Sequence, residues 1–428
     1  MVNVNLDKLP EYIPDFENKK ILIVGVGAVG SLYEDLIVKM GCKYITNMDK
    51  DNFEAENSAK GSWAYDVIED VGKNKAIALA DRMNDWIGEK CVHGIDGGVE
   101  SLGPMAFAAY DVVILAVDNY HAKIEGFNQK WLQIPPDQRP LLIYGGTFGE
   151  DVQCNILDGN EACVRCLVDE KWLENPLKRT SCTGINYRNA VLNGDIVRTT
   201  GLASRICANL MAEHTRAFFC GNRDMVNKCI FYNAYPNFGM TKAIPMKRKS
   251  CPDCKNFHYY EDMIVLPEGD VLHTSVNELI NMLTEKIGVK DFYIDIPIIE
   301  YAKVVYGNLI KDDYCKCCGR EMKNLYRHEF KTTYEAMLCD ECKNSGNKAI
   351  DSADNGKVGT FINTISSDNC DEILGNKTLY DIGFRLGEII VAHRMICGSD
   401  ILDGEYVDYV FYFAKDQEQL LMISKLEE

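Results

Sequence analysis

Eight of the 18 cysteines in this chain stand in Cys-x-x-Cys pairs, a spacing that lets two thiolates bind one metal ion. Two of these pairs are separated by only twenty residues: Cys315/Cys318 and Cys339/Cys342. That separation is typical of a zinc site. We therefore predict a zinc ion held by these four thiolates, with Cys317 and His328 as substitute ligands and a redox-active loop as the competing interpretation.

A glycine-rich loop, Gly25-x-Gly27-x-x-Gly30, lies between an apolar run at 21–24 and a segment with helical apolar spacing at 31–40. Glycines in such a turn let backbone N–H groups approach a nucleotide phosphate at the N-terminus of the following helix. This arrangement predicts a nucleotide site. A glycine turn that binds no ligand is the alternative.

Asp49 stands nineteen residues beyond the last of these glycines, at the end of a second predicted strand over 43–48. An acidic residue at that position can bind the ribose hydroxyls of a nucleotide. The loop and the acid do not distinguish NAD from ATP, because sites for both can use them.

The elements that must position these residues alternate between strands and helices. Besides the segments already named, we predict a helix over 73–86, strands over 111–117 and 141–144, and a long helix over 196–219. Such alternation is typical of an α/β fold, here a Rossmann-like, doubly wound, mostly parallel sheet.

Composition excludes several classes of function. The chain has 428 residues and a formal net charge of −18, which disfavours binding to a nucleic acid backbone. No apolar run approaches the ~18 residues of a membrane span, and residues 1–7 lack the features of a signal peptide. We expect a cytoplasmic protein with reduced, metal-binding thiols rather than disulfides.

Three further motifs carry a resemblance to a known family. They are Asp49-Lys-Asp51-Asn-Phe-Glu-Ala-Glu-Asn57-x-x-Lys60, Val71-Gly-Lys-Asn-Lys75-Ala76 and Asp118-Asn-Tyr-His-Ala-Lys123. Together with the glycine loop they resemble, over residues 18–258, the signature of the ThiF/MoeB/HesA superfamily. These are ubiquitin-activating-type enzymes, which adenylate the C-terminus of a ubiquitin-like protein.

The resemblance implies ATP and Mg²⁺ at the glycine loop. By position, Asp49 would bind the ribose, with Asp51 beside it. Asn57, Lys60 and Lys75 would contact the phosphates, and Asp118 would hold Mg²⁺. Lys75 and Asp118 would then be catalytic, since cations stabilise the charge that builds on a pyrophosphate leaving group.

The resemblance also assigns roles to cysteines. Cys182, in the predicted crossover loop over about 168–195, stands where relatives place the thiol that receives the activated acyl group as a thioester. The remaining Cys-x-x-Cys pairs match the family's structural zinc site, which would staple the base of that loop: Cys163, Cys166, Cys251 and Cys254.

We predict two domains, an ATP-binding adenylation domain over 1–258 and a smaller α+β domain over 259–428. In the second, a helix over 275–287 and a turn and strand over 377–391 weakly resemble a ubiquitin-like β-grasp fold, and an unrelated dimerisation domain fits equally well. The cysteine-rich insertion over about 311–348 has few apolar residues, so we expect it to fold only with bound zinc.

The resemblance implies a ubiquitin-like protein ending in Gly-Gly as substrate, a conjugating enzyme as acceptor, and a homodimer or a heterodimer with a second activating subunit. Two alternatives stay open. One is a sulfur-carrier adenylyltransferase of the thiamine or molybdopterin type. The other is a non-catalytic subunit, which is supported because Lys60 and Gly61 replace the family's Arg-Gln and no arginine precedes Arg82. The retained Asp49, Asn57, Lys75 and Asp118 oppose that alternative. An NAD-dependent dehydrogenase would lack these motifs.

Overall fold

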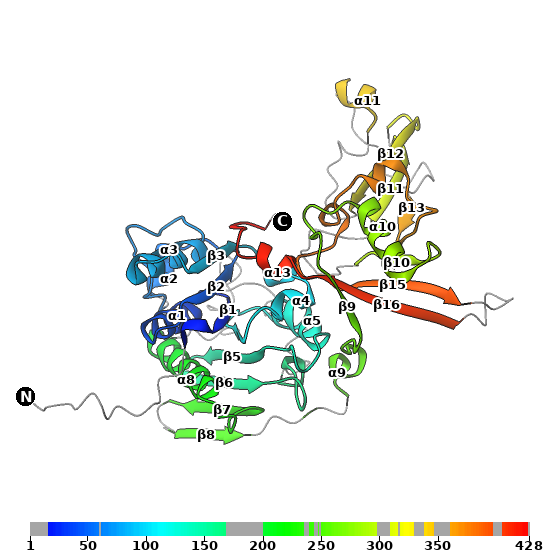
Figure 1. Cartoon of the computed structure of the whole chain (residues 1–428). Coiled ribbons are helices and arrows are strands. Elements are labelled where there is room, and N and C mark those ends of the chain that lie inside the picture. The colour runs from blue at the N-terminus through cyan, green and yellow to red at the C-terminus, as the bar shows by residue number, and fades with distance from the viewer. Residues whose placement is uncertain are drawn as a thin grey trace, which may run out of the picture. The chain divides into compact units, whose positions relative to one another are not determined.

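The computed structural model describes residues 16–59, 61–167, 200–234, 239–243, 247, 250–297, 309–315, 317–328, 338–345, 360–396 and 405–426. The chain forms two compact units (Figure 1). The first comprises Met1–Tyr260 and Leu421–Glu427, and the second comprises Glu261–Leu420. The chain therefore leaves the first unit, builds the second, and returns to the first.

The first unit is built on an eight-stranded sheet, with strand order β3-β2-β1-β4-β5-β6-β7-β8. The strands from β3 to β5 pair in parallel, and those from β5 to β8 pair antiparallel. In chain order the strands are β1 (Lys20–Val24), β2 (Tyr44–Asp49), β3 (Val92–Asp96), β4 (Val112–Leu115), β5 (Leu141–Phe148), β6 (Asp151–Leu157), β7 (Lys228–Asn233) and β8 (Gly239–Ala243).

Helices cover both faces of this sheet. The longer ones are α1 (Ala28–Lys39), α3 (Lys75–Ile87) and α8 (Gly201–Phe219), and they share one buried cluster with Ile21 and Ile23 of β1. Because side chains alternate along a strand, Leu22 of β1, also fully buried, points to the other face. The shorter segments are α2 (Ala55–Ala59), α4 (Pro104–Phe107), a π-helix (Ala122–Asn128), α5 (Gln129–Leu132), α9 (Pro252–Asn256) and 3-10 turns at Phe16–Asn18, Val99–Ser101 and Val164–Leu167.

Local sequence explains these elements. β4 reads Val-Val-Ile-Leu and is buried throughout, as a central parallel strand requires. The helix α3 begins where the Asn74 side chain accepts the N–H groups of Ala76 and Ile77, and it ends at Gly88, which is in the left-handed conformation. The predicted α/β fold with a parallel-rich sheet is confirmed, with an antiparallel extension from β5 onward.

The second unit is an α+β fold, as predicted. Its five-stranded sheet has the order β14-β10-β15-β16-β9, and α10 (Val276–Ile287) packs into its core with Phe411 and Phe413. Ser275 and Glu278 form a capping box at the start of α10, and left-handed Gly288 follows its end. The sheet strands are β9 (Met263–Leu266), β10 (Tyr293–Asp295), β14 (Thr364–Ile365), β15 (Ile390–Ile396) and β16 (Glu405–Phe413). The ubiquitin-like interpretation stays a prediction.

A separate three-stranded sheet, in the order β12-β11-β13, forms the rest of the second unit. Its elements and the remaining short helices are β11 (Leu309–Tyr314), β12 (Glu321–His328), α11 (Asp340–Asn344), β13 (Thr360–Ile362), α12 (Glu372–Gly375), a 3-10 turn (Tyr380–Ile382) and α13 (Asp416–Gln419). Across both units, none of the described helices has the length and apolarity needed to cross a bilayer.

Candidate nucleotide site and metal centres

The glycine loop joins β1 to α1, and its shape requires two of its three glycines. Gly25 has a φ of +86°, and its N–H donates to the carbonyl of Met48 over 2.8 Å. A Cβ on Gly30 would lie 2.0 Å from the carbonyl oxygen of Gly25, so only glycine lets the helix approach the loop this closely. A Cβ on Gly27 would meet no described atom within 4 Å. Gly27 is the N-cap residue of α1, so open space adjoins the helix N-terminus, where a phosphate can bind.

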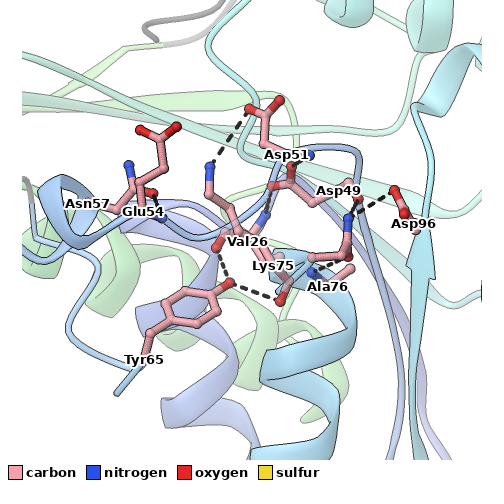
Figure 2. A network of polar contacts seen from close by, with 10 residues as sticks. Val26, Asp49, Asp51, Glu54, Asn57, Tyr65, Lys75, Ala76 and Asp96 are labelled. Atoms are coloured by element: carbon pink, nitrogen blue, oxygen red, sulfur yellow. Dashed lines mark hydrogen bonds and ion pairs between the residues drawn. The ribbon is translucent and has the colours of Figure 1, made fainter. Parts of the chain in front are cut away.

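Asp49 ends β2, and its carboxylate fixes the glycine loop. Its Oδ2 accepts the N–H of Val26 over 2.9 Å, and its Oδ1 accepts the N–H of Asp51 over 3.0 Å (Figure 2). Burial raises the pKa of Asp49 to about 6, and the nearby cation of Lys75 opposes that rise. Each carboxylate oxygen has a second lone pair, so a ribose hydroxyl can still donate to Asp49.

Lys75 is the first residue of α3, and its side chain is only 7% exposed. Its Nζ lies 3.7 Å from Oδ2 of Asp51, whose side chain is 35% exposed. Figure 2 shows the ammonium group directed toward Asp51, beside Asp49. Because a buried ammonium needs a compensating charge, Asp51 offsets the charge of Lys75 beside the end of β2.

Two residues that the sequence analysis missed connect these groups. The Tyr65 hydroxyl lies 2.6 Å from the carbonyl oxygen of Val26 and 3.2 Å from that of Lys75, so it bridges the glycine loop and α3. Asn74 caps α3 with its side-chain oxygen, and its Nδ2 donates to the Asp49 carbonyl and to Oδ1 of Asp96. Asparagine before a helical segment is a recognisable N-cap signal. No sequence signal marks Tyr65.

The other predicted ligands have different surroundings. Asn57 in α2 is buried, and its side-chain oxygen accepts the N–H of Glu54 over 2.8 Å. Asp118 follows β4 and is exposed. A carboxylate at the end of a parallel strand suits a magnesium ion bound together with phosphates. Lys60 and Cys182 lie outside the described residues, as does the whole predicted loop over 168–195.

Gly61, which stands where the family pattern has Gln, is required by the local backbone. Its φ is +105°, and a Cβ there would lie 2.8 Å from the Cα of Gly201, the first residue of α8. A Cβ on Gly201 would in turn lie 2.3 Å from the Trp63 ring. A glutamine at position 61 would therefore clash, and the departure from the family pattern follows from how this loop meets α8.

The first cysteine cluster gathers two pairs separated by 84 residues. Its four sulfur atoms lie within 4.8 Å of one another, with measured separations of 3.4–3.8 Å. A tetrahedral zinc ion with Zn–S bonds of about 2.3 Å spaces its sulfurs about 3.8 Å apart, so these four thiols fit zinc. The residues are Cys163, Cys166, Cys251 and Cys254.

Buried polar residues support this first cluster. Asp253 lies within the second Cys-x-x-Cys pair, and its carboxylate accepts from Nδ2 of Asn128 over 2.7 Å. The side-chain oxygen of Asn128 accepts the N–H of Val164 over 2.9 Å, within the first pair. Both halves of the cluster are thus held to the π-helix by one asparagine. Burial raises the pKa of Asp253, against the effect of its hydrogen bond from Asn128.

The second cluster also brings its four sulfur atoms within 4.8 Å of one another, with Cys318 and Cys339 3.7 Å apart. The backbone N–H of Cys339 donates to the sulfur of Cys315 over 3.2 Å, which suits a thiolate ligand. The four thiols that could hold a metal ion are Cys315, Cys318, Cys339 and Cys342, which is the predicted set without the substitutes Cys317 and His328. Zinc binding at both clusters stays a prediction.

Taken together, the predicted nucleotide site offers open space at the N-terminus of α1, a buried cation, and carboxylates after β2 and β4. Donors and a cation suit a polyphosphate, and the carboxylates suit ribose hydroxyls and a divalent metal. Such a site favours the transfer of a nucleotidyl group, because it can stabilise a phosphate leaving group.

Comparisons with known proteins identify a family and similar proteins for this chain. The sequence profile of the ThiF family matches residues 10–256. The ubiquitin-like modifier-activating enzyme 5 of Arabidopsis thaliana is 24% identical over an alignment of 271 residues, and the match covers 58% of this chain and 58% of that protein. The Dictyostelium discoideum protein of the same name is 22% identical over 255 residues, covering 56% of this chain and 62% of that protein.

The chain thus spans about three fifths of the length of the curated relatives it matches. Among solved structures, it is similar to the crystal structure of E. coli MccB with ATP, at 17% identity and a TM-score of 0.44. That match covers 57% of this chain and 68% of the MccB chain.

Proposed function

Because this chain belongs to the ThiF family, we propose that it uses ATP to adenylate the C-terminal carboxylate of a ubiquitin-like protein. The observation that carries the proposal is the buried Lys75, held beside Asp51 and Asp49 next to the open glycine loop. The names of the two curated relatives, ubiquitin-like modifier-activating enzymes, support the substrate class.

In the proposed reaction, a carboxylate oxygen of the substrate attacks the α-phosphorus of ATP. The bond between the α-phosphorus and the bridging oxygen breaks, and pyrophosphate leaves with the bonding electron pair. Lys75 and the N–H groups at the start of α1 would stabilise the charge on the leaving group. Asp118 would hold Mg²⁺, which supplies further positive charge to the phosphates.

A second step is proposed for Cys182. Its thiolate would attack the carbonyl carbon of the acyl-adenylate and expel AMP, leaving a thioester that passes to a conjugating enzyme. Lys178 and Arg179 are near in sequence and would favour the thiolate. In the alternative, sulfur-transfer reaction, the substrate carboxylate would be adenylated in the same way but would not form a thioester with Cys182. We further propose that the protein acts in the cytoplasm as a homodimer or with a second activating subunit.

Pyrophosphate exchange tests the first step. The chain would be mixed with Mg·ATP, labelled pyrophosphate and a ubiquitin-like protein ending in Gly-Gly, and label appearing in ATP would be counted. Lys75→Ala should reduce the exchange rate by about 100-fold or more. Lys73→Ala is the matched control, since Lys73 lies two residues away with its side chain 59% exposed, and it should stay within about twofold.

Intact mass under non-reducing conditions tests the second step. A thiol-sensitive adduct of one partner mass, absent in Cys182→Ala, would support the thioester. Pyrophosphate exchange that depends on the partner, without a covalent adduct, would support adenylation but not the thioester. That result would favour transfer to a sulfur acceptor. Absence of both signals with a partner that binds would overturn the enzymatic proposal and favour a non-catalytic subunit.

A further inference from the structure

The C-terminal segment of the first unit extends the edge of its sheet beside the nucleotide site. Residues 423–426 run parallel to the end of β3, which is the outermost strand on that side. The N–H of Asp96 donates to the carbonyl of Ser424 over 2.9 Å, and the N–H of Leu426 donates to the carbonyl of Asp96 over 2.9 Å. The ring of His93 also bonds to the carbonyl of Ile423.

A single apolar side chain anchors this segment. Leu426 is 4% exposed, and a Cβ built on Gly97 would lie 3.0 Å from the Cβ of Leu426. Gly97 therefore provides the space that the leucine fills. Leu421 and Met422, earlier in the same segment, are 58% and 74% exposed. The segment is therefore held by the buried Leu426 at its end and by backbone hydrogen bonds to Asp96. An extended peptide that adds to a sheet edge is held in the same way.

Asp96 connects the segment to the predicted site. It pairs with Asp49 across β2 and β3, and its Oδ1 accepts Nδ2 of Asn74 over 3.0 Å. Asn74 also donates to the carbonyl of Asp49 and caps the two N–H groups that follow Lys75. One continuous set of hydrogen bonds thus runs from the C-terminal segment to the first turn of α3.

We propose that residues 423–426 form a strap that positions the first turn of α3, and with it Lys75, for nucleotide binding. Asp96 is the last residue of an edge strand, and such ends open easily when nothing pairs with them. The strap forms hydrogen bonds with both the N–H and the carbonyl of Asp96. It thereby keeps the Asp96 carboxylate within hydrogen-bonding distance of Asn74. The ligand class, a nucleoside triphosphate with Mg²⁺, rests on the proposed function.

A point variant in the full-length chain tests the strap. Leu426→Ala removes the buried anchor, and Leu421→Ala is the matched control because it changes the same residue type at an exposed position of the same segment. We expect the Kd for Mg·ATP, measured by titration calorimetry, to rise about fivefold or more in Leu426→Ala only. In hydrogen exchange by mass spectrometry, a peptide covering Ala76 and Ile77 should exchange faster in the same variant.

Rescue distinguishes positioning from general loss of stability. A synthetic peptide with the sequence of residues 421–428, added to the Leu426→Ala chain, should restore the protection of Ala76 and Ile77 and the affinity for Mg·ATP. The same peptide carrying the Leu426→Ala change should do neither. Unchanged exchange at Ala76 and Ile77, or changed exchange with an unchanged Kd, would overturn the inference.

A failure of the proposed nucleotide-dependent function can be told apart from a failure of the strap proposal. If the wild-type chain binds no Mg·ATP, the nucleotide proposal is contradicted. The strap is then judged by exchange alone: faster exchange of Ala76 and Ile77 in Leu426→Ala, reversed by the peptide, supports it, and unchanged exchange overturns it.

Discussion

The two units each contain a cluster of four cysteines, but the clusters have different surroundings. In the first unit three of the four cysteines are buried, and the hydrogen bond between Asn128 and Asp253 lies beside them. The unit also has an eight-stranded sheet with an apolar core of its own. In the second unit Cys318 is exposed, and the local core among described residues is only Cys315, Leu338 and Cys342, with a few partly buried neighbours. Both units have an apolar core of their own, but the first cluster lies in the unit with the larger one, whereas the second cluster makes up most of the small local core around it.

The largest predicted effect comes from removing one thiol of each cluster, which tests directly whether the two clusters differ in structural importance. Cys315→Ser should abolish ordered structure around β11 and β12, because structural zinc contributes about 10 kcal/mol or more where little else holds the fold. Cys163→Ser should lose its metal while the eight-stranded sheet persists. Elemental analysis of zinc per chain and hydrogen exchange by mass spectrometry check both results.

Two thiols outside the clusters serve as controls for that experiment. Cys220→Ser in the first unit and Cys370→Ser in the second should leave the metal content unchanged, since neither thiol belongs to either group of four sulfurs. Equal loss of order in Cys163→Ser and Cys315→Ser would contradict the comparison.

Each unit also contains a buried acidic residue, Asp416 in the second unit and Glu34 in the first. Replacing Asp416 is expected to change the free energy of unfolding more than replacing Glu34. The two carboxylate oxygens of Asp416 accept the N–H groups of Val271 and Gly387 over 2.9 and 2.8 Å. Asp416→Asn leaves one buried N–H facing an NH₂ group, so we expect the free energy of unfolding to fall by about 2 kcal/mol. Urea denaturation monitored within the second unit measures it. Asp381→Asn, at a residue whose bond to Thr378 is exposed, should change stability less.

Glu34 of the first unit has a different environment and a predicted effect of opposite sign. It is fully buried in α1, and burial raises its pKa to about 8, against the effect of its hydrogen bond from Asn47. The folded chain therefore keeps a proton that the unfolded chain loses above its ordinary pKa near 4.5, so this residue lowers stability as pH rises toward 8.

Glu34→Gln removes that titration while keeping the shape of the side chain. We expect the variant to be more stable than the wild type by about 1–2 kcal/mol at pH 8, with a smaller difference at pH 5. Unfolding curves at both pH values measure the difference. A wild-type stability that rises between pH 5 and 8 in parallel with the variant would contradict the assignment.

The smallest expected effect concerns a charged group at the surface of the second unit. His393 of β15 lies between Asp408 of β16 and Asp295 of β10, with ring nitrogens 2.6 and 2.9 Å from their carboxylates. Burial lowers the pKa of His393, but the two aspartates more than offset this, so the net pKa is raised. Its stabilising contribution is complete below pH 6.5 and is lost as pH rises through the raised pKa.

Asp408→Asn should therefore lower the pKa of His393 and weaken the contacts across these strands by less than about 1 kcal/mol, because both aspartates are half exposed. An NMR titration of the His393 ring protons measures the pKa. A pKa that does not move would show that Asp295 alone sets it.

Much of the fold could be predicted from local sequence, because local hydrogen bonding and apolar periodicity decide it. The predicted strand over 21–24 is β1, the helix over 73–86 is α3, and that over 275–287 is α10. The antiparallel strands β6, β7 and β8 were not predicted, and the pairing of β6 with β7 joins segments that are distant in sequence. Tyr65 was missed for the same reason: its partners belong to two other elements.

The sequence by itself determined the motif residues, their order and the capping and turn residues that place the glycine loop between β1 and α1. Tertiary structure alone decided which distant groups meet. It brings Cys163 within 3.8 Å of Cys251, buries Lys75 beside Asp51, and seats Leu426 against Gly97 across some 330 residues. Spacing along the chain fixes only contacts within a turn or a helix, whereas contacts between distant segments form only where buried apolar surface makes the sheet and its helices pack together.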